Sequence, residues 1–323
     1  MSAPELSIII VNWNGEKLLP DCLGSIAEHP PTSAYEVIVV DNASTDQSIA
    51  WLESDGRRRL IPDERFRLIK NSENLGFGAA NNIAFKVAAS PVLFLLNPDA
   101  KVLEGTCDGI LTLFATRPEI EGVAPLIRNA DLTIQKCIRP ALPSPLTILA
   151  EAYRLHRLMT PQFASKVLMG PHWHYSREEF IPLTAAAGLA LRRRLVEAIG
   201  GFDESFHMYG EDDELCARIW KRGQKLLFSP SISIVHLSGS SSKTRWTVFA
   251  KAEVQERAFL RYQRRTCSRG RIIANASARL IVVIPLLFKY VFSQDSRRMF
   301  FRMACLNLRQ ILYPASLETE NVN

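Results

Sequence analysis

Four short apolar runs in the first hundred residues limit the fold of this chain more than any other feature. They are rich in β-branched residues, and segments with helical periodicity such as Leu18–Ala27 and Ala79–Ala88 separate them. The runs are Ile8–Val11, Val37–Val40, Arg67–Ile69 and Val92–Leu96. Strands that alternate with helices predict an α/β fold with a mainly parallel sheet and helices flanking it.

Polar side chains follow each of the four predicted strands. They are Asn12 and Asn14, then Asp41 and Asn42, then Asn71 and Asn74, and then Asn97 and Asp99. In a parallel sheet the carboxyl ends of the strands share one edge, and ligands bind in the crevice beyond that edge. We therefore expect the four groups to line one crevice.

Three of these groups carry a further pattern. Asp41 directly follows a strand, where a carboxylate can accept hydrogen bonds from a base or ribose, and Ser44 can cap the next helix. Gly76, in the stretch from Asn74 to Asn82, suits phosphate near a helix N-terminus or a tight turn without a ligand. Asn97 and Asp99 offer two oxygen ligands at the end of a buried strand, which suits Mg²⁺ or Mn²⁺, although Asn-Pro-Asp is also a common turn.

Four consecutive acids, Glu211 to Glu214, stand at the predicted start of a helix. Acids in a first turn interact favourably with the helix dipole by about 0.3 to 1 kcal/mol, so a helix cap alone would explain such a cluster. A carboxylate held there also suits the removal of a proton from an alcohol. Both interpretations stay open on this cluster alone.

Composition narrows the class of protein. With 323 residues and 47% hydrophobic content the chain is globular. Its six cysteines form no CxxC pair, which indicates a reducing compartment, and the first residues lack a basic region typical of a signal peptide. We therefore expect a cytoplasmic protein.

Charge divides the chain into a body and a tail. Residues 1–240 hold 24 Lys and Arg against 28 Asp and Glu, whereas residues 241–323 hold 15 against 5. The tail contains a helical pattern from about Thr244 to Arg265 and an apolar block, Leu280–Phe288, too short for the roughly 20 residues that span a membrane as a helix. It predicts either an amphipathic element on an anionic membrane surface or helices packed on the body, and we expect no nucleic-acid partner.

Residues 128–181 are rich in proline and predict a lid or an excursion toward an acceptor. Trp173 and Tyr175 in this segment could stack on a sugar ring, but packing inside the protein is the more common use of such residues. We therefore expect packing.

Six ordered motifs resemble family 2 glycosyltransferases of the GT-A fold, in particular the rhamnosyltransferase-like members of bacterial cell-envelope polysaccharide synthesis. The resemblance covers about residues 5–240. The motifs are Val11–Gly15, Val39–Asp46, Asn74–Phe77, Leu96–Asp99, Gly200–Glu204 and Tyr209–Asp212.

This resemblance implies inverting transfer of a sugar from a nucleotide-diphosphate donor to a hydroxyl, with Mg²⁺ or Mn²⁺ on the diphosphate. Asp212 would be the general base, supported by Glu211. Asp99 would bind the metal, and His236, in the run His236–Ser241, would be a weaker metal ligand. The donor would lie against residues at the strand ends. These are Asn12, Asp41, Asn42, Ser44, Asn74, Gly76, Asn82, Asn97 and Asp99.

The leading hypothesis is a hexosyltransferase that moves L-rhamnose from dTDP-L-rhamnose to a lipid-linked or polysaccharide acceptor at the inner face of the cell membrane. The alternatives are the same chemistry with a UDP-sugar donor of the GlcNAc, galactose or galactofuranose type, a non-catalytic nucleotide-sugar-binding module, and a nucleotidyltransferase. The predicted domains are a catalytic domain, 1–240, including the segment 128–181, and a basic helical region, 241–323, that is peripheral to the membrane.

Overall fold

Residues 3–140, 142–237, 248–290 and 293–314 are described by the computed structural model. The chain divides into two units, Met1–Ile138 with His174–Arg245, and Arg139–Trp173 with Trp246–Asn323. Residues 139–173, which the sequence places with the catalytic domain, therefore group with the C-terminal helices. The helical pattern expected from about Thr244 lies partly outside the described residues, and its described helix begins at Val248.

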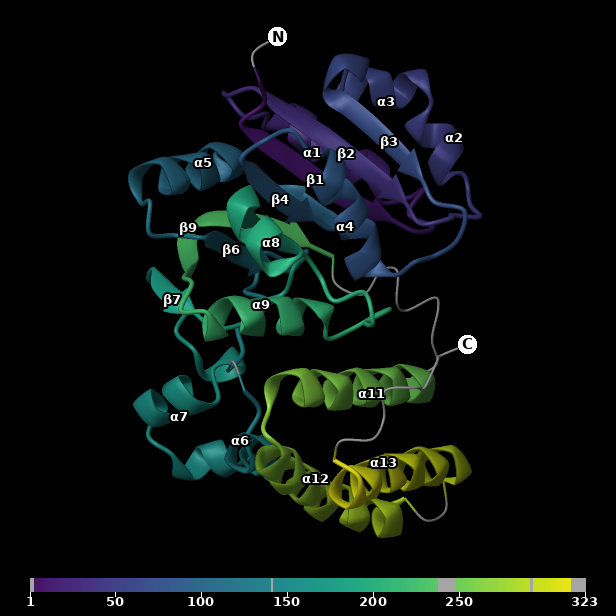
Figure 1. Ribbon diagram of the computed structural model, residues 1–323, viewed down its shortest axis with the longest axis vertical. Coiled ribbons are helices and arrows are strands. Elements are labelled where there is room, and N and C mark those ends of the chain that lie inside the picture. Colours follow the sequence, from purple (N-terminus) through teal and green to yellow (C-terminus); the bar gives the residue numbers. More distant parts are fainter. Residues whose placement is uncertain (1–2, 141, 238–247, 291–292, 315–323) are drawn as a thin grey trace. The chain divides into compact units, whose positions relative to one another are not determined.

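A nine-stranded sheet forms the centre of the first unit, with the strand order β3-β2-β1-β4-β8-β6-β9-β5 and β7 paired to β9 (Figure 1). The strands are β1 Leu6–Asn12, β2 Tyr35–Asp41, β3 Phe66–Lys70, β4 Val92–Leu96, β5 Ala100–Val102, β6 Gly122–Arg128, β7 Glu179–Ile181, β8 Gly188–Arg192 and β9 Leu226–His236.

The four strands expected from the sequence are β1 to β4, and they pair in parallel. Asn12 at the end of β1 lies in register with Asp41 at the end of β2, so the carboxyl ends meet as expected. The rest of the sheet is mixed: β8 runs antiparallel to β4 and β6, β5 and β7 run antiparallel to β9, and β6 and β9 are parallel. The α/β fold with flanking helices is confirmed.

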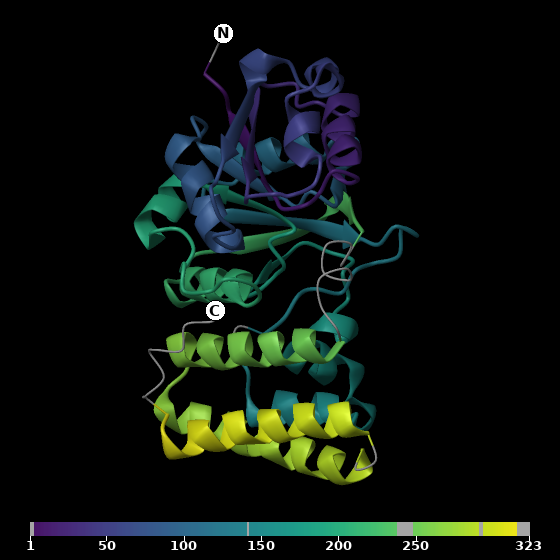
Figure 2. The same ribbon diagram turned by 90° about the vertical axis from the view of Figure 1, so that its right-hand side faces the viewer.

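Helices cover both faces of this sheet (Figure 2). The helices of the first unit are α1 Leu19–Glu28, α2 Ser48–Leu52, α3 Asp55–Leu60, α4 Phe77–Val87, α5 Thr106–Thr116, α8 Arg193–Ile199 and α9 Glu211–Lys221, with a 3-10 turn at Asp63–Arg65. Alternate residues of β1, such as Ile8 and Ile10, join Leu23 of α1 and Phe114 of α5 in one apolar core. The helix α4 packs on β1 and β2, and α9 packs on α4. Residues of β1, β2 and β4 are buried almost throughout, which explains their continuous apolar sequence.

The second unit is helical. Its helices are α6 Pro145–Ala152, α7 Pro161–Val167, α11 Val248–Thr266, α12 Arg269–Lys289 and α13 Gln294–Leu312, with 3-10 turns at Leu155–Leu158 and Gly170–His172. Its three long helices are joined at Glu256 of α11, which is 2% exposed. Arg279 of α12 donates to both oxygens of this carboxylate, and Asn307 of α13 donates to Oε1 at 2.8 Å. Polar contacts therefore hold the interior of this unit together.

The apolar block Leu280–Phe288 lies within a longer helix than expected. The helix α12 has 21 residues, and among the described residues it is the one helix long and apolar enough to cross a membrane by length and composition. Of the most apolar 18-residue stretch of α12, 28% is buried inside the structure.

We predict that Glu256→Gln destabilises the protein by about 2 to 3 kcal/mol, because it leaves the partly buried Arg279 guanidinium, 25% exposed, without its counter-charge. Glu253→Gln is the matched control on the same helix. Glu253 pairs with the more exposed Arg257 and Arg302, so its loss should cost less than about 1 kcal/mol. Urea unfolding of both variants measures the two free energies, and equal losses would contradict the central role of Glu256.

Candidate active site

The carboxylate of Asp41, the last residue of β2, accepts three hydrogen bonds. Asp41 is 1% exposed, and Asn12 Nδ2 donates to its Oδ1 at 2.7 Å. The Ser44 hydroxyl donates to the same oxygen at 2.6 Å, and the Ser44 backbone N–H donates to Oδ2 at 2.9 Å. The structure thus brings together Asn12, Asp41 and Ser44, three predicted site residues, and holds the Asp41 carboxylate at the carboxyl edge of the sheet.

An amide cluster follows at the ends of β2 and β3. Asn42 Nδ2 donates to the Gly76 carbonyl at 3.0 Å and to Asn74 Oδ1 at 3.2 Å, and Asn71 Nδ2 donates to Asn42 Oδ1 at 2.8 Å. Gly76 has φ +88°, and a Cβ there would lie 2.4 Å from the carbonyl oxygen of His207. Glycine is therefore required at position 76 because the backbone of the segment before α9 comes so close.

Asn82 of α4 fixes the same segment at a second point. The Phe202 N–H donates to Asn82 Oδ1 at 2.8 Å, and Asn82 Nδ2 donates to the Phe202 carbonyl at 3.0 Å and to Glu204 Oε1 at 2.9 Å. The sequence places Asn82 in the donor pocket. In the structure its amide holds the chain that leads to α9.

The helix α9 presents the four acids in its first turn, preceded by Gly210 with φ +85°. Asp212 Oδ1 accepts the N–H of Asp213 at 2.9 Å. Glu214 pairs with Arg218 at 2.7 Å, and Arg218 also donates to the carbonyls of Ile199 and Gly201 at 2.7 Å. These bonds set the orientation of the helix that carries Asp212.

Glu211 differs from its neighbour because it is buried, with 8% of its surface exposed. Burial, followed by the negative charge of Asp212, raises the pKa of Glu211 to about 8. Its Oε2 has no hydrogen-bond partner among the described residues. Its surroundings therefore favour the neutral form of Glu211 beside Asp212.

A third group forms where β4 and β9 end. His236 Nε2 lies 3.1 Å from Asp99 Oδ1 and 3.3 Å from Asn97 Nδ2. Asp99 is 7% exposed, and its backbone carbonyl accepts the N–H of Leu237 at 2.9 Å. The structure therefore joins Asn97, Asp99 and His236 as the sequence predicts. Residues Ser238–Ser241 of the histidine motif lie outside the described residues.

Sequence reasoning missed Gln135. Its Oε1 lies 2.9 Å from His236 Nδ1, and its Nε2 donates to Asn129 Oδ1 at 3.1 Å. Asn129 Nδ2 in turn donates to the Thr133 hydroxyl, which donates to Asp131 at 2.6 Å. Gln135 Oε1 is an acceptor for a proton on Nδ1 of His236, and that tautomer leaves the Nε2 lone pair on the side of Asn97 and Asp99. An isolated antiparallel β-bridge between Arg128 and Ile134 folds this turn beside β6. No pattern in the sequence of the proline-rich segment predicts this bridge.

These residues fit a divalent cation. Within the described ranges no three His, Cys, Asp or Glu side chains gather as a metal site. Asp99 Oδ1 and His236 Nε2 nevertheless face one another at 3.1 Å, close to the separation of about 3.0 Å expected for neighbouring ligands on an octahedral ion with bonds near 2.1 Å. Mg²⁺ commonly takes only one or two protein ligands and completes its shell with phosphate and water.

Trp173 and Tyr175 of the segment 128–181 serve packing, as expected. Trp173 is 6% exposed and Tyr175 is 4% exposed. The Tyr175 ring meets Phe228 edge-on with centroids 5.8 Å apart, and its hydroxyl accepts the N–H of Ile138 at 3.1 Å. Neither side chain is available to stack on a sugar.

We predict that Glu211→Gln flattens the pH dependence of stability. Because the folded-state pKa lies above the unfolded value, the folded state binds the extra proton, so the wild-type protein loses stability as pH rises from about 4.5 to about 8. The amide variant cannot ionise and should lose less stability over that range. Melting temperatures at pH 5 and pH 8 measure this, with Asp213→Asn as control, and an unchanged slope in Glu211→Gln would contradict the assignment.

Comparison with known proteins agrees with this geometry. The family model "Glycosyl transferase family 2" matches residues 7–172. The chain is 27% identical over 241 residues to "O-antigen biosynthesis protein RfbC" of Myxococcus xanthus, covering 74% of this chain and 18% of that protein. It is 26% identical over 242 residues to "N-acetylglucosaminyl-diphospho-decaprenol L-rhamnosyltransferase" of Mycobacterium tuberculosis, covering 68% of this chain and 70% of that protein.

Solved structures share the fold. The mannosyltransferase PcManGT of Pyrobaculum calidifontis, in complex with GDP-Man and Mn²⁺, has a TM-score of 0.56 at 17% identity over 98% of this chain and 89% of its own. GalNAc-T7, with UDP, GalNAc and Mn²⁺, has a TM-score of 0.56 at 18% identity over 96% of this chain and 58% of its own. The family match spans more than half of the sequence and includes β2, which ends at Asp41, and the turn after β4 that holds Asp99. The chain therefore belongs to glycosyltransferase family 2 and has the GT-A fold.

Proposed function

We propose that this glycosyltransferase moves a sugar from a nucleotide-diphosphate donor to an acceptor hydroxyl with inversion. Asp212 takes the hydroxyl proton as the acceptor oxygen bonds to the anomeric carbon and the bond to the diphosphate oxygen breaks. The observation that carries this proposal is the position of Asp212 in the first turn of α9. Arg218 anchors this helix, and the segment before it contacts Gly76 and Asn82. A non-catalytic binding module would not need this carboxylate.

The groups at the other strand ends suit the donor. Asp41, which accepts hydrogen bonds from Asn12 and Ser44, would face the nucleoside, and the Asn42 and Asn74 cluster would shape the pocket beside it. Asp99 and His236 would hold Mg²⁺ or Mn²⁺, with Asn97 beside them. When bound, the metal would offset the charge that grows on the leaving diphosphate.

We propose dTDP-L-rhamnose as the donor and a lipid-linked or polysaccharide hydroxyl as the acceptor, at the inner face of the cell membrane. Support comes from the similarity to the mycobacterial L-rhamnosyltransferase, whose name specifies a diphospho-decaprenol acceptor, and to RfbC. A UDP-sugar donor is the second candidate, because the GalNAc-T7 structure with the same fold holds UDP. A panel of both donor classes, scored by thermal stabilisation, tells them apart.

We predict that Asp212→Asn lowers kcat by about 10² to 10⁴-fold, because an amide cannot accept the acceptor proton. Donor binding should stay near wild type, since the base acts on the acceptor. Steady-state kinetics together with calorimetric titration of donor separate the two effects. Asp213→Asn is the matched control in the same turn and should keep most activity. Transfer that persists in Asp212→Asn would exclude it as the base.

We predict that Gln135→Leu weakens Mn²⁺ binding by about 10 to 100-fold, because it removes the Oε1 acceptor that lies 2.9 Å from His236 Nδ1 and orients the imidazole ring. Gln135→Glu keeps an acceptor and should bind Mn²⁺ at least as tightly as wild type. Electron paramagnetic resonance of free Mn²⁺, titrated with each variant and UDP or dTDP, measures affinity without turnover. Equal affinity in Gln135→Leu and wild type would refute the positioning role of Gln135.

A further inference from the structure

We propose that the helical unit docks on an anionic lipid surface through α12 and α13, lying in the interface without crossing it. This proposal does not depend on the transfer reaction, because the surface belongs to helices outside the catalytic unit. The occupant is a bilayer with negatively charged headgroups.

The first observation is the exposure of apolar side chains at helical spacing. On α12, Ile281, Ile284 and Phe288 are 54%, 45% and 76% exposed. On α13, Phe301, Leu308 and Leu312 are 61%, 49% and 61% exposed. Steps of three, four and seven residues place each set on one side of its helix. Two adjacent helices thus each carry an apolar stripe that faces solvent, and such exposed patches mark interaction sites.

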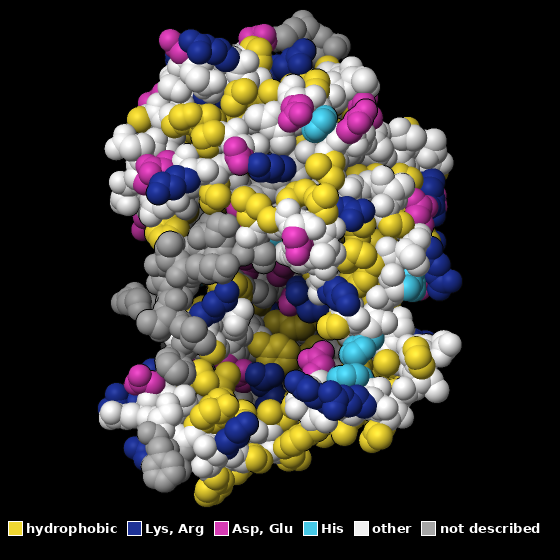
Figure 3. Space-filling view, turned by 180° about the vertical axis from the view of Figure 1, so that it is seen from behind, with side chains coloured by type: hydrophobic (Ala, Val, Ile, Leu, Met, Phe, Trp, Pro, Cys, Tyr) yellow, Lys and Arg dark blue, Asp and Glu magenta, His cyan; other side chains and the backbone are white. Residues whose placement is uncertain are grey.

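The second observation is the charge beside these stripes. Residues 248–314 hold 13 Lys and Arg against 3 Asp and Glu. On α13 Arg298, Arg302 and Arg309 follow one another at steps of four and seven, so they form a basic stripe next to the apolar one. Figure 3 shows hydrophobic side chains interspersed with Lys and Arg on the surface of the protein. This combination suits anionic lipid, since each basic residue near the surface contributes about 1 kcal/mol.

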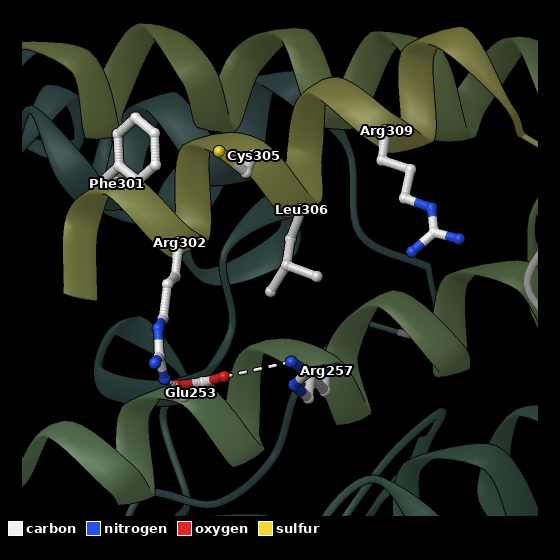
Figure 4. Close-up of a pocket in the computed structure, with 7 residues that line it drawn as sticks. All are labelled: Glu253, Arg257, Phe301, Arg302, Cys305, Leu306 and Arg309. Carbon is white, nitrogen blue, oxygen red and sulfur yellow. Dashed lines mark hydrogen bonds and ion pairs between the residues drawn. The ribbon is translucent and has the colours of Figure 1, made fainter. Parts of the chain in front are cut away.

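A groove between α11 and α13 extends the basic stripe. It has a volume of about 400 Å³, and its lining includes Arg257, Arg302, Arg309 and the apolar side chains of Phe301 and Leu306. Figure 4 shows Arg302 reaching toward Glu253 of α11, which also accepts from Arg257. Three guanidinium groups against one carboxylate leave a net positive charge, which suits the phosphate of a lipid headgroup with its chain along the apolar wall.

The interior of the unit favours an interfacial position over a spanning one. Arg279 lies near the middle of α12 and bonds to Glu256, and Asn275 Nδ2 donates to Gln263 Oε1 at 2.7 Å. These bonds attach α12 to α11, which carries many charges. A spanning α12 would leave this arginine in the hydrocarbon, at a cost of about 2.5 kcal/mol or more.

The test is sedimentation of the full chain with vesicles of phosphatidylcholine alone and with 30 mol% phosphatidylglycerol, without donor or metal. We expect binding to the anionic vesicles only, with release in 0.5 M NaCl. The double variant Phe288→Ser with Phe301→Ser, and separately the triple variant Arg298→Gln, Arg302→Gln and Arg309→Gln, should each lower the bound fraction at least tenfold. Trp220→Ser, on the catalytic unit and 42% exposed, is the apolar control and should bind like wild type.

Two results would overturn the proposal. Equal binding of wild type and both multiple variants would show that α12 and α13 do not form the docking surface. Resistance to both salt and alkaline carbonate would show that a helix crosses the bilayer. A third arm of the experiment adds soluble glycerol phosphate as a competitor. If glycerol phosphate does not displace the protein from the vesicles, a bilayer is supported as the partner. Displacement at low millimolar concentration would show that the groove binds free phosphate. Circular dichroism confirms that each variant is folded.

Discussion

The parallel register of β1, β2 and β4 is the constraint on which the site depends. It brings Asn12 level with Asp41 and places Asn97 and Asp99 at the same edge. The polar residues of these strand ends therefore share the edge at which α/β folds bind their ligands. The segment before α9 then lies against this edge, because Gly76 admits the His207 carbonyl and Asn82 bonds to both polar backbone atoms of Phe202. The edge of the sheet thus positions a helix more than a hundred residues away.

The acids of α9 acquire different properties from different surroundings. Glu211 is buried, so desolvation favours its neutral form, whereas Glu214 is paired with Arg218. Asp212 lies between them in the first turn, where the helix dipole favours a carboxylate. One run of four similar residues therefore provides a buried carboxyl with a raised pKa, a structural ion pair and the proposed base. Burial and partners, which the linear sequence does not display, make the difference.

The sequence predicts the parallel half of the sheet well because buried parallel strands have continuous β-branched runs. It predicts poorly the strands of the mixed half, such as β7 and β8, because their short runs and antiparallel pairings follow from distant partners. The same limit applies to the site. Asn97, Asp99 and His236 follow strands and could be predicted, whereas Gln135 reaches His236 through a turn that only the folded chain reveals.

In the helical unit, the residues that join the helices differ from the apolar residues that face outward. Directed bonds around Glu256, Asn275 and Asn307 join its helices, while Phe288 and Phe301 face outward. Surface residues can therefore change without altering the contacts that join the helices. A few substitutions at exposed positions could therefore add or remove membrane association in related chains without a change in the catalytic unit. The location of such an enzyme in the cell would then evolve faster than the reaction that it catalyses.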